Sequence, residues 1–235
     1  MTASGRRIHN PPDPEGAPAN LPHKLQGGST TAPKSFRIGT MKPVVLALAL
    51  LLPCLAIGPE IDTAKAVGNP MAPIRLDLYS DFQCPHCKVL HETLLPTIIK
   101  DYVATGKAYF VSHEFPLNGH QYAREAANYA TAAARIGKYQ QVTDAIFQSQ
   151  NSWGMTGKVW DVVAAVLSPA DQKKVQALAK DPGVLAEVEK DRQSGEALRV
   201  NQTPTMFVTK GAKQTPWTYW TDYNLFKGYL NDQLK

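Results

Sequence analysis

Two stretches of the chain alternate hydrophobic and polar side chains with the period of a β-strand. In residues 73–80 every second side chain is aliphatic: Ile74, Leu76 and Leu78. The side chains between them are more polar, so the pattern predicts a strand with one buried face. A second strand is predicted over about 108–115, where hydrophobic side chains on one side include Tyr109, Val111 and Phe115.

Between these strands the hydrophobic period becomes helical. The residues that share one face are Val89, Leu90, Leu94, Ile98 and Tyr102. This spacing predicts a helix that begins at Pro85, because a proline in the first turn lacks only an N–H that would be unpaired there anyway. Pro96 lies inside the helix and is expected to kink it.

Residues 119–198 have only helical patterns. Small residues form a seam along the first of these helices at Ala123, Ala126, Ala127, Ala130, Ala133 and Ala134. Gly137 is expected to end that helix. Ser168 before Pro169, and Asp181 before Pro182, predict the starts of two later helices.

The strand pattern returns near the C-terminus. Residues 205–209 and 215–220 are predicted to form a hairpin around the turn Lys210-Gly211, and a last helix begins at Thr221. The order is strand–helix–strand, a helical block, then strand–strand–helix, without an internal repeat. This order predicts an α/β protein.

The N-terminal region lacks the patterns of the rest. Residues 1–40 are rich in Pro, Gly, Ser, Thr and Asn, and we expect a disordered extension or a mis-assigned start before Met41. Residues 41–66 are typical of a secretory signal peptide. The hydrophobic run 44–57 would rise only about 21 Å as a helix, short of the roughly 30 Å hydrocarbon core of a membrane.

The end of the signal peptide has two candidate positions. Ala64-Lys65-Ala66 has the small-x-small pattern, whereas cleavage after Ala56 would lie closer to the hydrophobic run. An uncleaved membrane anchor is the alternative. Cys54 loosely resembles the cysteine of a lipoprotein signal, but Pro53 before it fits such a signal poorly.

Composition and charge narrow the class of protein. Hydrophobic residues make up 43% of the chain and charged residues 19%, which is typical of a globular protein with a sizeable core. The formal net charge is +5, but residues 67–235 hold 18 Lys/Arg against 16 Asp/Glu. This near balance, without a basic stripe, argues against a nucleic-acid partner.

The chain after residue 66 contains one cysteine pair, Cys84-Pro85-His86-Cys87. At a helix start the first thiol, Cys84, lies where unpaired N–H groups and the helix dipole favour an anion, and we expect it to be exposed. His86 can add positive charge or a hydrogen bond to that thiolate. Cys87, one turn further and underneath, is expected to resolve the mixed disulfide. Stabilising the thiolate makes the disulfide a stronger oxidant.

Two other roles for the pair stay open. Cys84, Cys87 and His91 share a helical face and could bind a metal, but a structural zinc site uses four ligands and no second cysteine pair exists. A purely structural disulfide is also conceivable, although so short a loop restrains the unfolded chain little.

Three motifs resemble the DsbA family of exported thioredoxin-fold oxidoreductases. They are the segment 79–87 (Tyr-Ser-Asp-Phe-Gln-Cys-Pro-His-Cys), the segment 115–139, and Gln202-Thr203-Pro204-Thr205. The resemblance covers about 70–235. It implies an α/β thioredoxin-like fold with a central mixed sheet, built from 67–117 and 199–235, and an inserted helical domain over 118–198.

The resemblance also implies a mechanism and partners. Cys84, Pro85, His86 and Cys87 would form the catalytic segment, and Thr203 with Pro204, joined by a cis peptide bond, would bind an extended substrate. Reduced proteins would be the substrates, and a DsbB-like, quinone-linked membrane oxidase would reoxidise the dithiol. The resemblance implies no cofactor of the protein's own and no metal, an exported location in the periplasm or its equivalent, and a monomer.

Isomerase or reductase activity on the same fold is the alternative function. Isomerases of the DsbC and DsbG type have an N-terminal dimerisation domain, for which about fifteen residues between the signal and the first strand leave no room. Thr203 differs from the Val often found before this proline in DsbA oxidases, which leaves the redox direction open.

Several other residues are expected to be structural. His91, His113 and His120 are interpreted as structural or surface residues, and Glu114 as an exposed or salt-bridged residue rather than a proton relay near Cys87. The four tryptophans are expected in the core or lining a groove: Trp153, Trp160, Trp217 and Trp220. Phe82 is a candidate to line the peptide groove.

Overall fold

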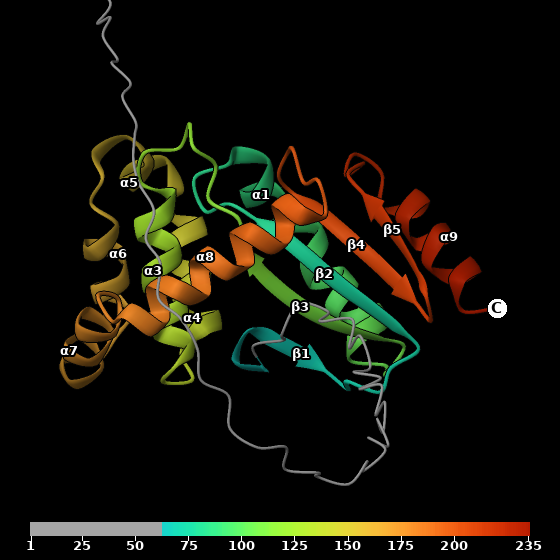
Figure 1. The fold of residues 1–235 in the computed structure, drawn as a ribbon, viewed down its shortest axis with the longest axis horizontal. Helices are drawn as coiled ribbons and strands as arrows, with labels where there is room; N and C mark the ends of the chain where they lie inside the picture. Colours follow the sequence, from blue (N-terminus) through green and yellow to red (C-terminus); the bar gives the residue numbers. More distant parts are fainter. Residues whose placement is uncertain (1–62) are drawn as a thin grey trace, which may run out of the picture. The chain divides into compact units, whose positions relative to one another are not determined.

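The computed structural model describes residues 63–235, and within them one sheet organises the fold (Figure 1). Its strand order is β1-β3-β2-β4-β5. The strands are β1 (Ala66–Gly68), β2 (Ile74–Ser80), β3 (Ala108–Glu114), β4 (Thr205–Lys210) and β5 (Lys213–Trp217). β2 pairs in parallel with β3 and antiparallel with β4, so the predicted α/β class with a central mixed sheet is confirmed.

The central strand β2 differs from its prediction because both of its faces are buried. Asp77 and Tyr79 were expected on the exposed face, yet they are 2% and 0% exposed. Tyr79 packs edge-on against Phe115 and Phe207 on this second face. Gly195 of the neighbouring helix approaches so closely that a Cβ there would lie 2.6 Å from the Phe115 ring. A helix therefore covers the face that alternation alone predicted to be open.

The helix that begins right after Cys84 and contains Cys87 runs from Pro85 to Val103, but its type changes along its length. It consists of α1 (Pro85–Val89), the π-helical η2 (Leu90–Leu94), α2 (Leu95–Ile98) and the π-helical η3 (Ile99–Val103). Pro96 has no N–H for the preceding turn, and the π-helical turn η2 ends two residues before it, at Leu94. The irregularity that Pro96 predicts thus takes the form of a wider turn.

Between β3 and β4 the chain is helical, as predicted. The helices are α3 (Ala123–Ala134), α4 (Tyr139–Gln148), α5 (Gln150–Thr156), α6 (Val159–Ala165), α7 (Pro169–Leu178) and α8 (Pro182–Ala197). Ser168 and Asp181 cap α7 and α8, and Gly137 takes a φ of 68° after α3. These local signals are confirmed because each depends only on neighbouring residues.

The described residues belong to one compact unit, and the division into a core and an inserted domain stays a prediction.

Two hydrophobic cores meet at the dithiol. One lies between the sheet and the helices η2, α2, η3 and α9 (Tyr223–Gln233), and it includes Ile74, Leu76 and Leu78. The other lies among the helices α3 to α8 and includes Phe82, Cys84 and Cys87 themselves. The cysteines therefore sit at the junction of the sheet and the helical block.

The short strand β1 and the preceding 3₁₀ turn η1 (Thr63–Lys65) were not predicted from the sequence. β1 pairs antiparallel with β3. Lys65 is 2% exposed and its Nζ lies 3.0 Å from Asp191 and 3.1 Å from Glu187, both on α8. Cleavage after Ala66 would therefore remove a buried ion-paired lysine, whereas cleavage after Ala56 would keep it. The expectations for residues 1–62 lie outside the described residues.

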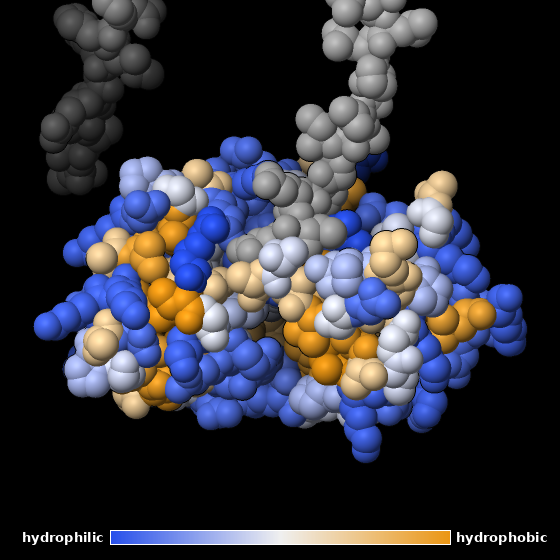
Figure 2. Space-filling model, turned by 90° about the horizontal axis from the view of Figure 1, so that it is seen from below, coloured by the Kyte–Doolittle hydropathy of each residue, from blue (hydrophilic) through white to orange (hydrophobic). Residues whose placement is uncertain are grey.

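Hydrophobic residues on the face drawn in Figure 2 lie in patches separated by hydrophilic residues. Isolated patches of this kind are usual on a protein surface. Among residues 63–235, no helix has both the length and the hydropathy needed to cross a membrane.

Candidate active site

Cys84 lies at the junction of strand and helix that the sequence predicted. β2 ends at Ser80, three residues form a loop, and Cys84 becomes the N-cap of α1 with φ −76° and ψ 122°. Pro85 follows in the first turn, and the carbonyl of Cys84 accepts a hydrogen bond from the N–H of Lys88. The reactive cysteine is thus fixed by a strand on one side and a helix on the other.

Both cysteines are free thiols, and both are buried. Cys84 is 5% exposed and Cys87 1%, so the expectation of an exposed first thiol was wrong. The reason is the loop before β4, which folds over the site: Sγ of Cys84 lies 3.4 Å from the carbonyl oxygen of Thr203. Only the tertiary structure brings this loop, 119 residues away, over the cysteine.

The two thiols have opposite acidities. The Cys87 thiol, as hydrogen-bond donor, lowers the pKa of Cys84 to about 5, and the backbone N–H groups of Cys87 and His86 add to this against the effect of burial. Burial raises the pKa of Cys87 well above its ordinary value, and the neighbouring Cys84 adds to the rise. At neutral pH Cys84 is therefore the thiolate and Cys87 the thiol.

Asp81 connects the two cysteines to the loop that follows β3. Its backbone N–H donates to Sγ of Cys87 at 3.4 Å, and its carbonyl accepts from the N–H of Cys84. Its buried carboxylate accepts from the N–H groups of Gln83 and Leu117 and pairs with His120 Nδ1 at 2.8 Å. No local sequence signal marks this role of Asp81, because only the fold brings these donors together.

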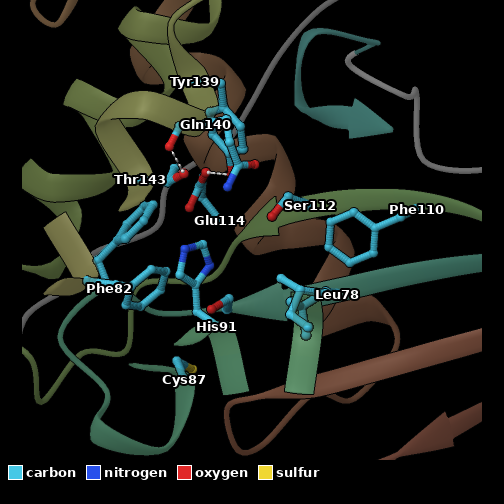
Figure 3. Close-up of a pocket in the computed structure, with 13 residues that line it drawn as sticks. Leu78, Phe82, Cys87, His91, Phe110, Ser112, Glu114, Tyr139, Gln140 and Thr143 are labelled. Carbon is cyan, nitrogen blue, oxygen red and sulfur yellow. Dashed lines mark hydrogen bonds between the residues drawn. The ribbon is translucent and has the colours of Figure 1, made fainter. Parts of the chain in front are cut away.

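A cavity of about 30 Å³ separates Cys87 from Glu114 (Figure 3). Both side chains line it, together with Ser80, Ser112 and Tyr139. This volume is enough for one or two waters beside polar partners. The buried thiol and the carboxyl group thus border the same small cavity, whose walls also include Leu78, Phe82 and Phe147.

Glu114 was expected to be exposed or salt-bridged, and it is buried at 2% exposure. Burial raises the pKa of Glu114 to about 7, although Lys65 and the hydrogen bond from Tyr139 oppose the rise. The Tyr139 hydroxyl donates to Glu114 Oε1 at 2.7 Å. A carboxyl group with this pKa can exchange a proton near neutral pH.

Behind Glu114 lies a buried group of charges. His113 Nε2 pairs with Asp77 and Nδ1 with Asp191, each at 2.9 Å. Burial alone would lower the pKa of His113, but these hydrogen bonds outweigh it and raise the pKa. Asp191 also pairs with Lys65 and accepts from the N–H of Glu114. His113 is structural, as predicted.

On the other side of Cys84 a groove of about 640 Å³ opens to the surface. His86, Thr203 and Pro204 line it, together with Val89 and Trp220. Thr203–Pro204 is a cis peptide, as the resemblance implied. The Trp220 indole N–H donates to the carbonyl of Pro204 at 3.0 Å, which ties the far wall of the groove to the loop that covers Cys84. His86 is exposed and lines this groove.

The remaining predicted residues lie in structural positions. His91 pairs with Asp144 at 2.7 Å, and Phe82 packs on Phe147 inside the helical core rather than in the groove. Trp153 is fully buried. Within the described part of the chain, no group of three or more His, Cys, Asp or Glu side chains could hold a metal ion.

Two glutamines that sequence reasoning missed hold the loop before Cys84. The Gln83 side chain accepts from the N–H of Tyr122 and donates to the carbonyl of Gly154. Gln150 Nε2 donates to the carbonyls of Phe82 and Cys84. Gln83 directly precedes the dithiol in the sequence. Gln150 lies 66 residues after Cys84, and no local signal marks it.

Comparisons with known proteins agree with this site. The family model described as thioredoxin matches residues 60–220. The Probable disulfide bond formation protein D of Bacillus anthracis is 25% identical over 74% of this chain and 79% of its own length. The solved structure of oxidised BdbD from Bacillus subtilis superposes with a TM-score of 0.63 at 21% identity, covering 75% of this chain and 95% of that one.

The chain is also similar to part of a protein whose name is that of a transporter. The Na(+)/H(+) antiporter NhaA 1 of Mycolicibacterium gilvum is 30% identical over 74% of this chain. The match spans only 27% of the length of that antiporter.

A buried dithiol with one thiolate and one thiol, at a helix start on a mixed sheet, defines a thiol–disulfide oxidoreductase. The match to the family model extends over more than half of the sequence. The chain belongs to the thioredoxin family, the predicted thioredoxin-like fold is confirmed, and the resemblance to DsbA proteins is confirmed in the fold.

Proposed function

We propose that this protein is an exported dithiol oxidase that passes the Cys84–Cys87 disulfide to reduced substrate proteins. The observation that carries the proposal is the split acidity of the pair: the pKa of Cys84 is lowered to about 5, whereas that of Cys87 is raised. A stabilised thiolate favours the reduced form, and a dithiol that favours its reduced form is a strong oxidant.

The transfer takes two exchange steps. A substrate thiolate attacks Sγ of Cys84, the Cys84–Cys87 bond breaks, and Cys87 leaves as a thiolate. A second substrate thiolate then attacks the substrate sulfur of the mixed disulfide, and Cys84 leaves as a thiolate. Two electrons pass from the substrate to the dithiol, and the low pKa of Cys84 makes it a good leaving group.

Cys87 needs a proton in the first step, because a thiolate is unfavourable in its buried position. Glu114 is the candidate donor, since it lines the same cavity and its pKa of about 7 lets it hold a proton near neutral pH. In the reverse direction, during reoxidation, Glu114 takes the proton back. Asp81 assists through its N–H to the Cys87 sulfur.

The groove beside Cys84 is the proposed substrate site. Thr203 and Pro204 line it next to the reactive sulfur, and the exposed His86 stands at its edge. An extended segment of a reduced protein would lie along Thr203 and pair with its backbone. Contacts of this kind are made with the backbone of the substrate, so we expect a broad range of substrates and no cofactor.

Export is part of the proposal, because a disulfide donor needs an oxidising compartment. We assign residues 41–66 to a signal that directs the chain to the periplasm or its equivalent. Cleavage after Ala56 is favoured over cleavage after Ala66, because Lys65 pairs with Asp191 in the folded protein. If the segment is not cleaved, it tethers the enzyme. A DsbB-like membrane oxidase would reoxidise the dithiol, and the protein would act as a monomer.

The decisive measurement is the reduction potential of the Cys84–Cys87 couple in a glutathione buffer. We expect a value clearly more positive than the roughly −270 mV of thioredoxin. A value at or below that of thioredoxin would contradict the oxidase and favour a reductase. Vigorous reshuffling of a scrambled disulfide substrate, without net oxidation, would favour an isomerase.

A further inference from the structure

Gln150 is the first residue of α5, and its side chain reaches the backbone on both sides of Gln83. Its Nε2 lies 2.7 Å from the carbonyl oxygen of Phe82 and 3.0 Å from that of Cys84. A primary amide nitrogen has two protons, so both are used. Gln150 is 4% exposed, and water has little access to replace these bonds.

The carbonyl of Cys84 has a special place in the site. It belongs to the N-cap residue, so its direction sets the ψ of 122° at which the chain enters α1. The same dihedral angle places Sγ of Cys84 relative to the first N–H groups of the helix. The carbonyl also accepts the first helical bond from Lys88 at 3.2 Å, so Gln150 is a second, lateral donor to it.

The position of Gln150 is itself fixed by the helical block. α5 is tied to the loop a second time, because the Gln83 amide donates to the carbonyl of Gly154 at 3.0 Å. Phe82 packs on Phe147 with ring centroids 4.9 Å apart. Movement of α5 would therefore be transmitted to the Cys84 peptide group.

We propose that Gln150 is a positioning residue for the exchange reaction, which holds the Cys84 carbonyl so that the thiolate faces the N–H groups of the first helical turn. The inserted helices then have a direct part in the redox chemistry. This inference rests on the proposed function, since it concerns the thiolate that performs the exchange.

The test compares two glutamines with the same bonding pattern. Gln150→Met keeps the length of the side chain and removes both donors. The matched control is Gln172→Met, because Gln172 Nε2 also donates to two backbone carbonyls, those of Ala164 and Leu167, at 2.9 and 3.1 Å, with no contact to the dithiol. Loss of stability alone would be similar in both variants.

The readouts are the pKa of Cys84, from the pH dependence of alkylation and thiolate absorbance, and the equilibrium with glutathione. In Gln150→Met we expect the pKa of Cys84 to rise by about half to one unit, and the equilibrium constant for oxidising glutathione to fall about three- to tenfold, the size of one hydrogen bond. In Gln172→Met both values should equal those of the wild type.

An unchanged Cys84 pKa and glutathione equilibrium in a folded Gln150→Met protein would overturn the inference and leave Gln150 a stabilising residue only. Equal shifts in both variants would overturn it too. If Gln150→Met does not fold, Gln150→Leu, which also lacks the donors, replaces it. A wild-type protein that exchanges no disulfides would instead refute the proposed function, so the two failures are distinguishable.

Discussion

The two sides of the dithiol are built from the same residue type but have different surroundings. On the Cys84 side, backbone N–H groups and the neighbouring thiol stabilise negative charge, and an open groove lies beside the sulfur. On the Cys87 side, the residue lines a small cavity whose acidic member is Glu114. The acidity of a cysteine is therefore set by what the fold places around it. Under the proposed function, the Cys84 side exchanges sulfur and the Cys87 side exchanges protons.

The largest expected effect separates the two cysteines. Cys84→Ser should abolish disulfide transfer, because the attacked sulfur is missing. In Cys87→Ser, the Cys84 thiolate should attack a disulfide of an oxidised substrate protein and release one substrate thiolate, and the mixed disulfide should accumulate because Cys87 is not there to resolve it. Non-reducing gels show both outcomes, the loss of transfer with a reduced model substrate and the trapped mixed disulfide with an oxidised one. Full transfer activity in the Cys84→Ser protein would refute the assignment of roles.

The next effect concerns the charges behind the Cys87 side. Lys65→Met should lower the free energy of unfolding by about 2 to 3 kcal/mol, because it removes a buried cation from the partly buried carboxylates of Asp191 and Glu187. It should also raise the pKa of Glu114 further, since Lys65 opposes that rise. Urea unfolding measures the first effect. Lys174→Met, which removes an exposed ion pair, is the control and should cost little.

Glu114→Gln tests the proton-exchanging side. The pKa of Glu114 is higher in the folded protein, about 7, than its ordinary 4.5, so the folded state binds the proton more tightly. Its contribution to stability is complete below about pH 4.5 and is lost as the pH rises towards 7. In the wild type this loss should lower the free energy of unfolding by about 1 to 3 kcal/mol. The glutamine variant should not show it. Parallel pH dependence of unfolding in both proteins would contradict the assignment.

The same variant should slow exchange. Without Glu114, protonation of the departing Cys87 thiolate depends on solvent, and we expect roughly a tenfold slower transfer at neutral pH. Stopped-flow measurement of substrate oxidation checks this. Tyr139→Phe, which keeps the carboxyl group and removes its hydrogen bond, should have a smaller effect.

The smallest effect is expected at the rim of the groove. His86 is exposed, so its replacement by Ala should make the disulfide only modestly less oxidising, by about two- to fivefold in the glutathione equilibrium. An unchanged reduction potential would show that only the backbone N–H of His86 acts on the thiolate. The low pKa of Cys84 would then owe nothing to the imidazole of His86.

The sequence by itself determined the local features of this protein. Alternation placed β2 and β3, capping residues placed α7 and α8, and the Cys84–Cys87 spacing identified the chemistry. Each of these depends on residues within about one or two turns of each other, so spacing and residue type suffice.

The tertiary structure decided what surrounds those features. Burial of both faces of β2, the cover of Thr203 over Cys84, and the cavity that joins Cys87 to Glu114 all arise from contacts between distant segments. Solvent exclusion and the direction of hydrogen bonds depend on such contacts, and they set the pKa values. The sequence therefore predicted which residues react, whereas the packing of the chain decided why one thiol is acidic and the other is not.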